Sequence, residues 1–87
     1  MTATDRLSFA IDLARRAGQL GMRFFRELDS LTIESKGHQD LVSNADREVE
    51  LFVRAEIAAN YPQDGIVGEE HAPVQGISGD VWVIDPI

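Results

Sequence analysis

Apolar residues recur at helical spacing through the first third of the chain. Between residues 4 and about 28 they step by three and four positions: Leu7, Ala10, Ile11, Ala14, Gly18, Met22 and Phe25. This spacing places them on one face of a long helix, and Thr4 or Asp5 can cap its start. Gly18 and Gly21 lower helix propensity, so we expect them to mark a close approach by another element.

The middle of the chain predicts a short strand, a loop and a second helix. Residues 31–36, "LTIESK", alternate apolar and polar positions as a strand does, and "GHQDLVS" (37–43) has the composition of a loop. Ser43 or Asn44 can then cap a second helix. Its apolar positions are Val49, Phe52, Val53 and Ile57, and the segment "NYPQDG" ends it.

Two further strands are expected near the end of the chain. They are "GIVGEE" (65–70) and "VWVIDPI" (81–87), joined by a loop rich in proline and glycine. The second is apolar throughout, which is typical of a strand buried on both faces. Two helices cover only one face of a sheet. We therefore expect an α+β fold in which residues 1–87 form the N-terminal part of one longer domain.

Length and composition narrow the class of protein. Eighty-seven residues make at most one small domain, and 44% hydrophobic with 26% charged residues is ordinary for a globular protein. No apolar run approaches the roughly 20 residues that a membrane helix needs. The chain has no cysteine, which excludes disulfides and thiolate metal sites and fits a reducing cytoplasm.

The net charge of −7 disfavours nucleic acid as a partner, because a polyanion is repelled overall. Acidity at this level is also compatible with solubility alone. A more specific interpretation, that some carboxylates are gathered around a cation, depends on where they lie.

Four acids stand where elements begin or end. Asp46 lies at the start of the second helix, Glu69 and Glu70 end one strand, and Asp85 ends another. Such positions present side chains to a cleft. Carboxylates that converge there repel one another unless a cation offsets the charge, and Mg²⁺ prefers oxygen ligands. The alternative for each acid is a solvated cap or turn residue.

Three motifs in this order carry a family resemblance. "DLVSNAD" (40–46), "GEE" (68–70) and "WVIDPI" (82–87), with a lysine upstream at Lys36, resemble the first half of the inositol monophosphatase family of metal-dependent phosphatases. The match runs from Lys36 to Ile87. Each motif alone is a weak pattern, whereas the three in order are specific.

The resemblance implies roles for individual residues. Glu69 matches a direct magnesium ligand, Asp85 a carboxylate that bridges metal ions, and Ile87 a position whose backbone carbonyl also ligates. Glu70 matches an acid that orients the attacking water. Asp46 matches an acid that helps a threonine activate that water.

The residues that match the edge of the site precede the second helix. Lys36 matches a basic residue there, and Asp40 and Ser43 match the loop that shapes it. Two histidines stand nearby, but His38 and His71 lack the spacing of metal ligands and are expected to be surface or hydrogen-bonded residues. Trp82 is expected in the core.

The same resemblance implies a fold and an activity. The intact protein would be a layered αβαβα sandwich and a homodimer. Two or three Mg²⁺ ions would activate water to hydrolyse a small phosphate monoester, with inositol monophosphate as the first candidate. Relatives that act on histidinol phosphate, fructose bisphosphate or phosphoadenosine phosphate share this metal core, so these substrates stay open. A non-catalytic module that binds a partner through its acidic face is the alternative from another class.

The chain also departs from the family pattern. The family continues with Asp-Gly-Thr directly after the position of Ile87, and its substrate-binding residues lie in its C-terminal half. We therefore expect the 87 residues alone to be inactive and not stably folded.

Overall fold

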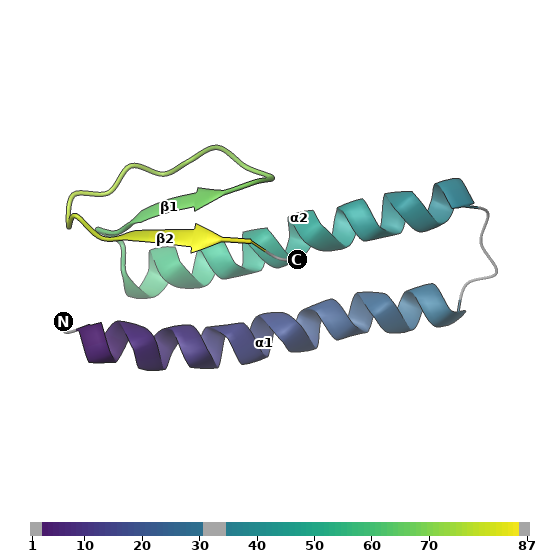
Figure 1. The fold of residues 1–87 in the computed structure, drawn as a ribbon, viewed down its shortest axis with the longest axis horizontal. Helices are drawn as coiled ribbons and strands as arrows, with labels where there is room; N and C mark the ends of the chain where they lie inside the picture. The colour runs from purple at the N-terminus through teal and green to yellow at the C-terminus, as the bar shows by residue number, and fades with distance from the viewer. Residues whose placement is uncertain (1–2, 31–34, 86–87) are drawn as a thin grey trace.

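The computed structural model describes the backbone of residues 3–30 and 35–85, and the side chains of residues 4–26 and 44–85. Two helices precede two short strands: α1 (Ala3–Ser30), α2 (Ser35–Asn60), β1 (Gly65–Gly68) and β2 (Val81–Ile84). The helices lie side by side and antiparallel, and the strands pack against one end of the pair (Figure 1). The predicted α+β class is confirmed.

The two helices are joined by apolar and ionic contacts. Leu13 of α1 and Ile57 of α2 are both buried in the core. Beside them, the guanidinium of Arg16 donates to Glu56 of α2 and, at 2.9 Å, to Asp12 of its own helix. Neither helix, over its described residues, is long and apolar enough to cross a membrane.

The sheet consists of two parallel strands. Gly65 pairs with Val81 at one end and Gly68 with Ile84 at the other. Val74 adds an antiparallel bridge to Ile66, with backbone N–O distances of 2.9 and 2.8 Å. Because the strands are parallel and in register, the residues that follow β1 and β2 emerge at the same edge of the sheet.

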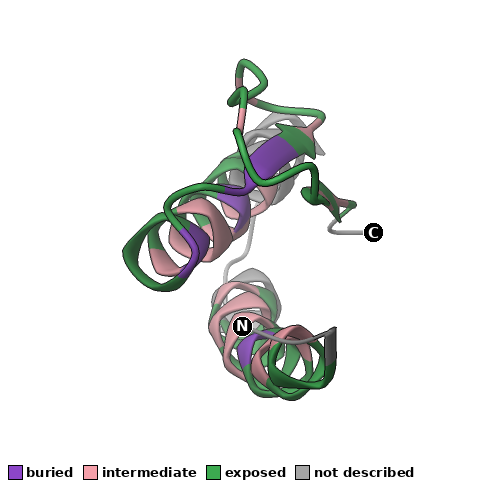
Figure 2. Cartoon of the chain, turned by 90° about the vertical axis from the view of Figure 1, so that its left-hand side faces the viewer, coloured by how far each residue is buried: buried purple, intermediate pink, exposed green. Residues whose placement is uncertain are grey.

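The core lies where the strands meet the helices. Its buried apolar residues are Leu13, Ile57, Tyr61 and Ile66. Figure 2 shows buried segments of α2 and β1 beside one another, with the outer surfaces of both helices exposed. Phe9 packs edge-on against Tyr61 and Trp82, at ring centroid distances of 5.1 and 5.7 Å. The predicted core position of Trp82 is confirmed.

The prediction for residues 31–43 is wrong where it can be checked. Helix α2 begins at Ser35, so the expected loop at 37–43 is helical and neither Ser43 nor Asn44 caps a helix start. Residues 31–34 of the expected strand lie outside the described residues. No proline interrupts residues 35–43, and a single glycine, Gly37, costs a helix only about 1 kcal/mol.

The helices cover one face of β2, as expected of two helices, and leave Val81 59% and Val83 78% exposed on the other face. The packing prediction for Gly18 and Gly21 is wrong. A Cβ added at Gly18 or Gly21 would meet no atom within 4 Å, so no described element approaches α1 closely there.

Candidate active site

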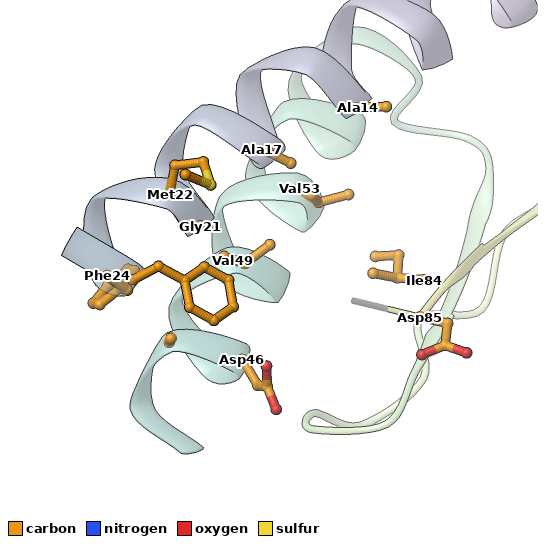
Figure 3. A pocket seen from close by; sticks show the side chains of 13 residues that line it. Ala14, Ala17, Gly21, Met22, Phe24, Asp46, Val49, Val53, Ile84 and Asp85 are labelled. Carbon is orange, nitrogen blue, oxygen red and sulfur yellow. The ribbon is translucent and has the colours of Figure 1, made fainter. Parts of the chain in front are cut away.

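A cavity of about 390 Å³ lies between the two helices and the end of β2. Apolar side chains of α1 and α2 form most of its lining, with Ile84 closing one side. The carboxylates that border it are those of Asp46 and Asp85. Figure 3 shows Asp46, which belongs to α2, and Asp85, which is the residue directly after β2. Two acids from distant parts of the sequence therefore share one cavity.

Small residues of α1 keep this cavity open. Ala14, Ala17, Gly18 and Gly21 lie along it. Since a Cβ at either glycine would meet nothing within 4 Å, their missing side chains add to the space. In this structure the two glycines line a cavity and do not form a close contact with another helix.

Glu69 and Glu70 lie at the neighbouring strand end. Both are exposed, directly after Gly68. Since Gly68 pairs with Ile84, Glu69 and Asp85 each follow the last residue of a paired strand. Neither glutamate is among the described residues that line the cavity. Among the side chains that the structure describes, no group of three or more His, Cys, Asp or Glu is arranged to hold a metal ion.

A buried glutamate lies directly beneath this strand end. The Glu50 side chain of α2 is fully buried and accepts a hydrogen bond from the backbone N–H of Glu70 at 3.2 Å. Its other oxygen accepts from Arg54 Nε at 3.0 Å. Arg54 also donates to the carbonyls of His71 and Ala72, at 2.9 and 2.7 Å. Burial raises the pKa of Glu50. The hydrogen bonds that its carboxylate accepts from the Glu70 N–H and from Arg54, together with the positive charge of Arg54, outweigh burial and hold the pKa of Glu50 below the usual value.

The backbone of β1 comes unusually close to this carboxylate. A Cβ at Gly68 would lie 2.6 Å from Cδ of Glu50, which is closer than real Cβ contacts. A side chain at this position would therefore displace the Glu50 carboxylate from its present place at the strand end.

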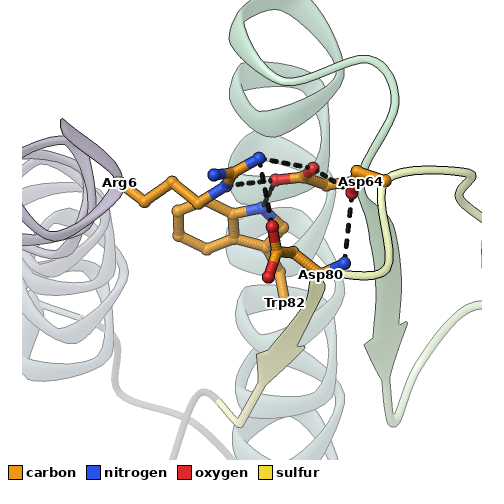
Figure 4. Close-up of polar contacts among 5 residues, drawn as sticks. Arg6, Asp64, Asp80 and Trp82 are labelled. Carbon is orange, nitrogen blue, oxygen red and sulfur yellow. Dashed lines mark hydrogen bonds and ion pairs between the residues drawn. The ribbon is translucent and has the colours of Figure 1, made fainter. Parts of the chain in front are cut away.

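A second buried carboxylate joins the other ends of the strands to α1. Asp64 accepts hydrogen bonds from Arg6 (2.9 and 3.0 Å), from the Ser78 hydroxyl (2.6 Å) and from Trp82 Nε1 (2.8 Å), as Figure 4 shows in part. Arg6 also lies 3.3 Å from Asp80. The hydrogen bonds from Arg6 and Ser78 hold the pKa of Asp64 well below its usual range, although burial opposes them.

Neither Glu50 nor Asp64 was predicted as a functional or structural residue. The i, i+4 spacing of Glu50 and Arg54 is a signal for a helical ion pair. It says nothing of burial. Asp64 stands in a segment that reads only as a helix stop, and its partner Arg6 lies 58 residues away.

Comparison with known proteins decides the family. The sequence model of the inositol monophosphatase family matches residues 3–87, almost the whole chain. The chain belongs to the inositol monophosphatase family.

Its relatives carry different names. A histidinol-phosphatase of Chlorobaculum parvum is 39% identical over 97% of this chain and 32% of its own length. The Nus factor SuhB of Escherichia coli K12 is 37% identical, over 93% of this chain and 31% of its own. An inositol-1-monophosphatase of Rhizobium meliloti is 33% identical, over all of this chain and 33% of its own. The chain spans about a third of the length of these curated relatives.

The structure describes only part of the family-like site. It brings Asp46 and Asp85 to one cavity and leaves Glu69 and Glu70 at the adjacent strand end. The side chains of Lys36, Asp40 and Ser43 lie outside the described residues, although their backbone belongs to α2. Ile87 and the side chain of His38 also lie outside them. His71 is half-buried, with Nε2 3.5 Å from the carbonyl of Arg47.

The donors present fit a hard divalent cation. Asp46 and Asp85 offer carboxylate oxygens at one cavity, and Glu69 follows the strand that pairs with β2. Oxygen donors of this kind suit Mg²⁺, which needs only a few protein carboxylates and retains water molecules. Softer metals that favour thiolates have no ligand here, because the chain contains no cysteine.

Proposed function

We propose that residues 1–87 supply part of the active site of a Mg²⁺-dependent phosphatase that hydrolyses a small phosphate monoester. The observation that carries the proposal is the cavity shared by Asp46 and Asp85, next to the strand end that bears Glu69. Family membership supports it independently. The remaining residues of the site would come from segments that the longer relatives possess.

In this proposal the acids divide into two roles. Glu69 and Asp85, with the backbone carbonyl of Ile87, hold two or three Mg²⁺ ions. When bound, these ions supply positive charge beside the phosphoryl oxygens and lower the pKa of water. Glu70 orients the attacking water, and Asp46 helps a threonine, supplied by the part of the site outside these residues, to activate that water.

The edge of the site belongs to Lys36, Asp40 and Ser43. A lysine there attracts the anionic substrate, because opposite charges attract across a low-dielectric cleft. Asp40 and Ser43 shape the segment that leads to Asp46. We further propose that the intact protein is a cytoplasmic homodimer.

The substrate that we propose first is inositol monophosphate. Histidinol phosphate follows closely, because a relative named as a histidinol-phosphatase is 39% identical. Fructose bisphosphate and phosphoadenosine phosphate are further candidates within the same chemistry. A non-catalytic acidic module remains the alternative from another class. It is the weaker proposal, because a module without catalysis gains nothing from keeping carboxylates that repel one another.

The test compares single variants of the intact protein. Phosphate release from inositol 1-phosphate and histidinol phosphate is measured against Mg²⁺ concentration, together with metal binding by calorimetry. We expect Glu69→Gln and Asp85→Asn to lose metal binding and at least about 100-fold in activity, since the ions contribute several kcal/mol to the transition state. Glu56→Gln, which alters a carboxylate of α2 far from the strand ends in sequence, is the control.

Two results would contradict the proposal. One is a folded protein that hydrolyses neither ester and binds no Mg²⁺, which supports the non-catalytic module. The other is hydrolysis that is unchanged in Glu69→Gln and Asp85→Asn, which places the site elsewhere.

A further inference from the structure

Two side chains of α2, those of Glu50 and Arg54, contact the backbone of the segment that follows β1. Glu50 accepts from the N–H of Glu70, while Arg54 donates to the carbonyls of His71 and Ala72. Three consecutive residues therefore have backbone contacts with one buried ion pair. We propose that Glu50 and Arg54 are positioning residues that fix the strand end carrying Glu69 and Glu70. This inference rests on the proposed function of those two acids.

Glu50 is not itself placed to bind a cation. Its side chain is fully buried, and its two oxygens accept from different donors, Glu70 N–H and Arg54 Nε. The backbone of Gly68 covers it closely enough to exclude a Cβ. A carboxylate engaged in this way acts on the site through the backbone that it holds.

The chemistry of the pair suits alignment better than stability. A buried ion pair adds little net stability over a well-packed apolar pair, because desolvation offsets the attraction. Hydrogen bonds at defined angles, however, fix the orientation of the groups that they join. Arg54 is well suited to this, since its planar guanidinium donates to Glu50 and to two carbonyls at the same time.

Within the part of the chain that the structure describes, the further contact between residues 69–72 and α2 is that of His71 Nε2 with the carbonyl of Arg47, at 3.5 Å. Glu69 and Glu70 are exposed, and β1 ends at Gly68. A metal ligand on such a segment binds tightly only if the backbone is already oriented, because otherwise binding must also order the loop. Residues that orient metal ligands typically change metal affinity or activity 10- to 100-fold when they are replaced.

Glu50→Gln tests the inference with a minimal change of shape. An amide has one acceptor oxygen in place of two, so it cannot accept from both Glu70 and Arg54 as the carboxylate does. In the intact protein we expect the Mg²⁺ concentration for half-maximal hydrolysis to rise about 10- to 100-fold. Glu56→Gln is the matched control, because Glu56 also lies on α2 and also pairs with an arginine. Its Mg²⁺ midpoint should stay within about twofold of the wild-type value.

Arg54→Lys is a second variant for the case in which Glu50→Gln does not fold. Lysine keeps a positive charge beside Glu50 but cannot reproduce the fork that reaches both carbonyls. We expect this variant to fold and to show a Mg²⁺ midpoint raised by about tenfold.

Hydrogen exchange gives a readout that needs neither metal nor activity. Deuterium uptake of a peptide covering residues 68–72, measured without Mg²⁺, should be several-fold faster in Glu50→Gln and Arg54→Lys than in Glu56→Gln. A purely structural pair would instead lower the melting temperature and leave the Mg²⁺ midpoint unchanged.

The outcomes separate the two proposals. If the wild-type protein shows Mg²⁺-dependent hydrolysis but both variants keep its Mg²⁺ midpoint and its exchange rates, the positioning role is wrong and the function stands. If the wild-type protein neither binds Mg²⁺ nor hydrolyses an ester, the proposed function is wrong, and so is the proposed effect of Glu50 and Arg54 on metal affinity. Faster exchange in the variants would then show only that the pair holds the segment.

Discussion

At the residue scale, the two buried carboxylates hold the two ends of the strands. Asp64 lies just before β1 and contacts Trp82 of β2, whereas Glu50 contacts the backbone of Glu70, two residues after β1. Each carboxylate has an arginine partner, and each is almost completely buried. Charged side chains rarely occupy such positions unless they are paired. The strand pair is therefore fixed to the helices by polar contacts as well as by the core.

Asp64 gives the first prediction. Asp64→Asn removes the ion pair of Arg6 with Asp64, leaving Arg6 with Asp80 at 3.3 Å, and removes an acceptor from a site that Ser78 and Trp82 also contact. Losing charge-assisted hydrogen bonds of this kind costs about 1.5 to 3 kcal/mol, and urea unfolding measures it. Asp12→Asn is the control, because Asp12 forms an exposed pair with Arg16 and should cost at most about 1 kcal/mol.

The same residue also predicts a pH dependence. Because the folded state lowers the pKa of Asp64, its stabilisation is complete above the ordinary aspartate pKa of about 3.9. The stabilisation is lost progressively as the pH falls below that value, because Asp64 of the unfolded chain then takes up a proton that the folded carboxylate beside Arg6 does not. Wild-type protein should therefore lose more unfolding free energy than Asp64→Asn between about pH 5 and pH 2. Equal slopes in the two proteins would show that Asp64 does not hold this network.

At the element scale, α1 is a long helix that carries two glycines beside a cavity. Gly18 and Gly21 lie in its interior, where glycine is unfavourable by about 1 kcal/mol relative to alanine. Nothing in the structure occupies the space that a Cβ would fill. The glycines therefore weaken the helix without a contact that requires them among the described residues.

Alanine at these positions is the second prediction. Gly18→Ala and Gly21→Ala should each raise the free energy of unfolding by about 0.5 to 1 kcal/mol, measured by urea titration of the intact protein. Gly76→Ala is the control and should be destabilising, since its Cβ would lie 2.5 Å from the backbone carbon of Asp64. Destabilisation by Gly18→Ala would instead support the close approach that the sequence predicts.

The strands illustrate what pattern alone can and cannot predict. The positions of β1 and β2 follow from short apolar runs bounded by glycine, proline and acids, and the structure confirms both. Their burial does not follow. An apolar sequence such as Val81–Ile84 suits burial on both faces, yet burial depends on which other elements are present to cover it.

At the scale of the whole molecule, local sequence predicted the elements but not the contacts that join them. The helical period of residues 4–28 and the three family motifs are readable within short windows. The contacts Arg6–Asp64 and Glu50–Glu70 span 58 and 20 residues, and no periodicity indicates them. Glycine at position 68 is likewise explained only by the carboxylate packed against it. The prediction for residues 35–43 was wrong at the level of the local element, because the polar composition of this segment suits a loop and a solvated helix equally.

The core of the chain is small for its surface. Among the side chains that the structure describes, four large apolar residues are buried, whereas Ile77, Val81 and Val83 are exposed. The molecule measures 47 × 24 × 17 Å, and such an elongated shape buries little surface. For the 87-residue chain by itself we therefore expect an unfolding free energy below the usual range of about 5 to 15 kcal/mol.

The exposed face of β2 gives the third prediction, a matched pair of valine substitutions in the 87-residue chain. Val83, at 78% exposure, contributes little to the core, so Val83→Thr should change the unfolding free energy by less than about 0.5 kcal/mol. Val53 packs against the core, and Val53→Thr should cost about 1 to 3 kcal/mol because it buries a hydroxyl. Urea unfolding followed by tryptophan fluorescence measures both changes, because Trp82 lies in the aromatic cluster.

The same pair of variants tests the surface that β2 presents. An exposed apolar face is prone to associate with other chains, so Val83→Thr should also reduce concentration-dependent light scattering, whereas Val53→Thr should increase it by exposing the core. If Val83→Thr instead destabilises the chain as much as Val53→Thr does, the outer face of β2 is covered in solution. The folded state in solution would then differ from the arrangement described here, in which the helices cover only one face of β2.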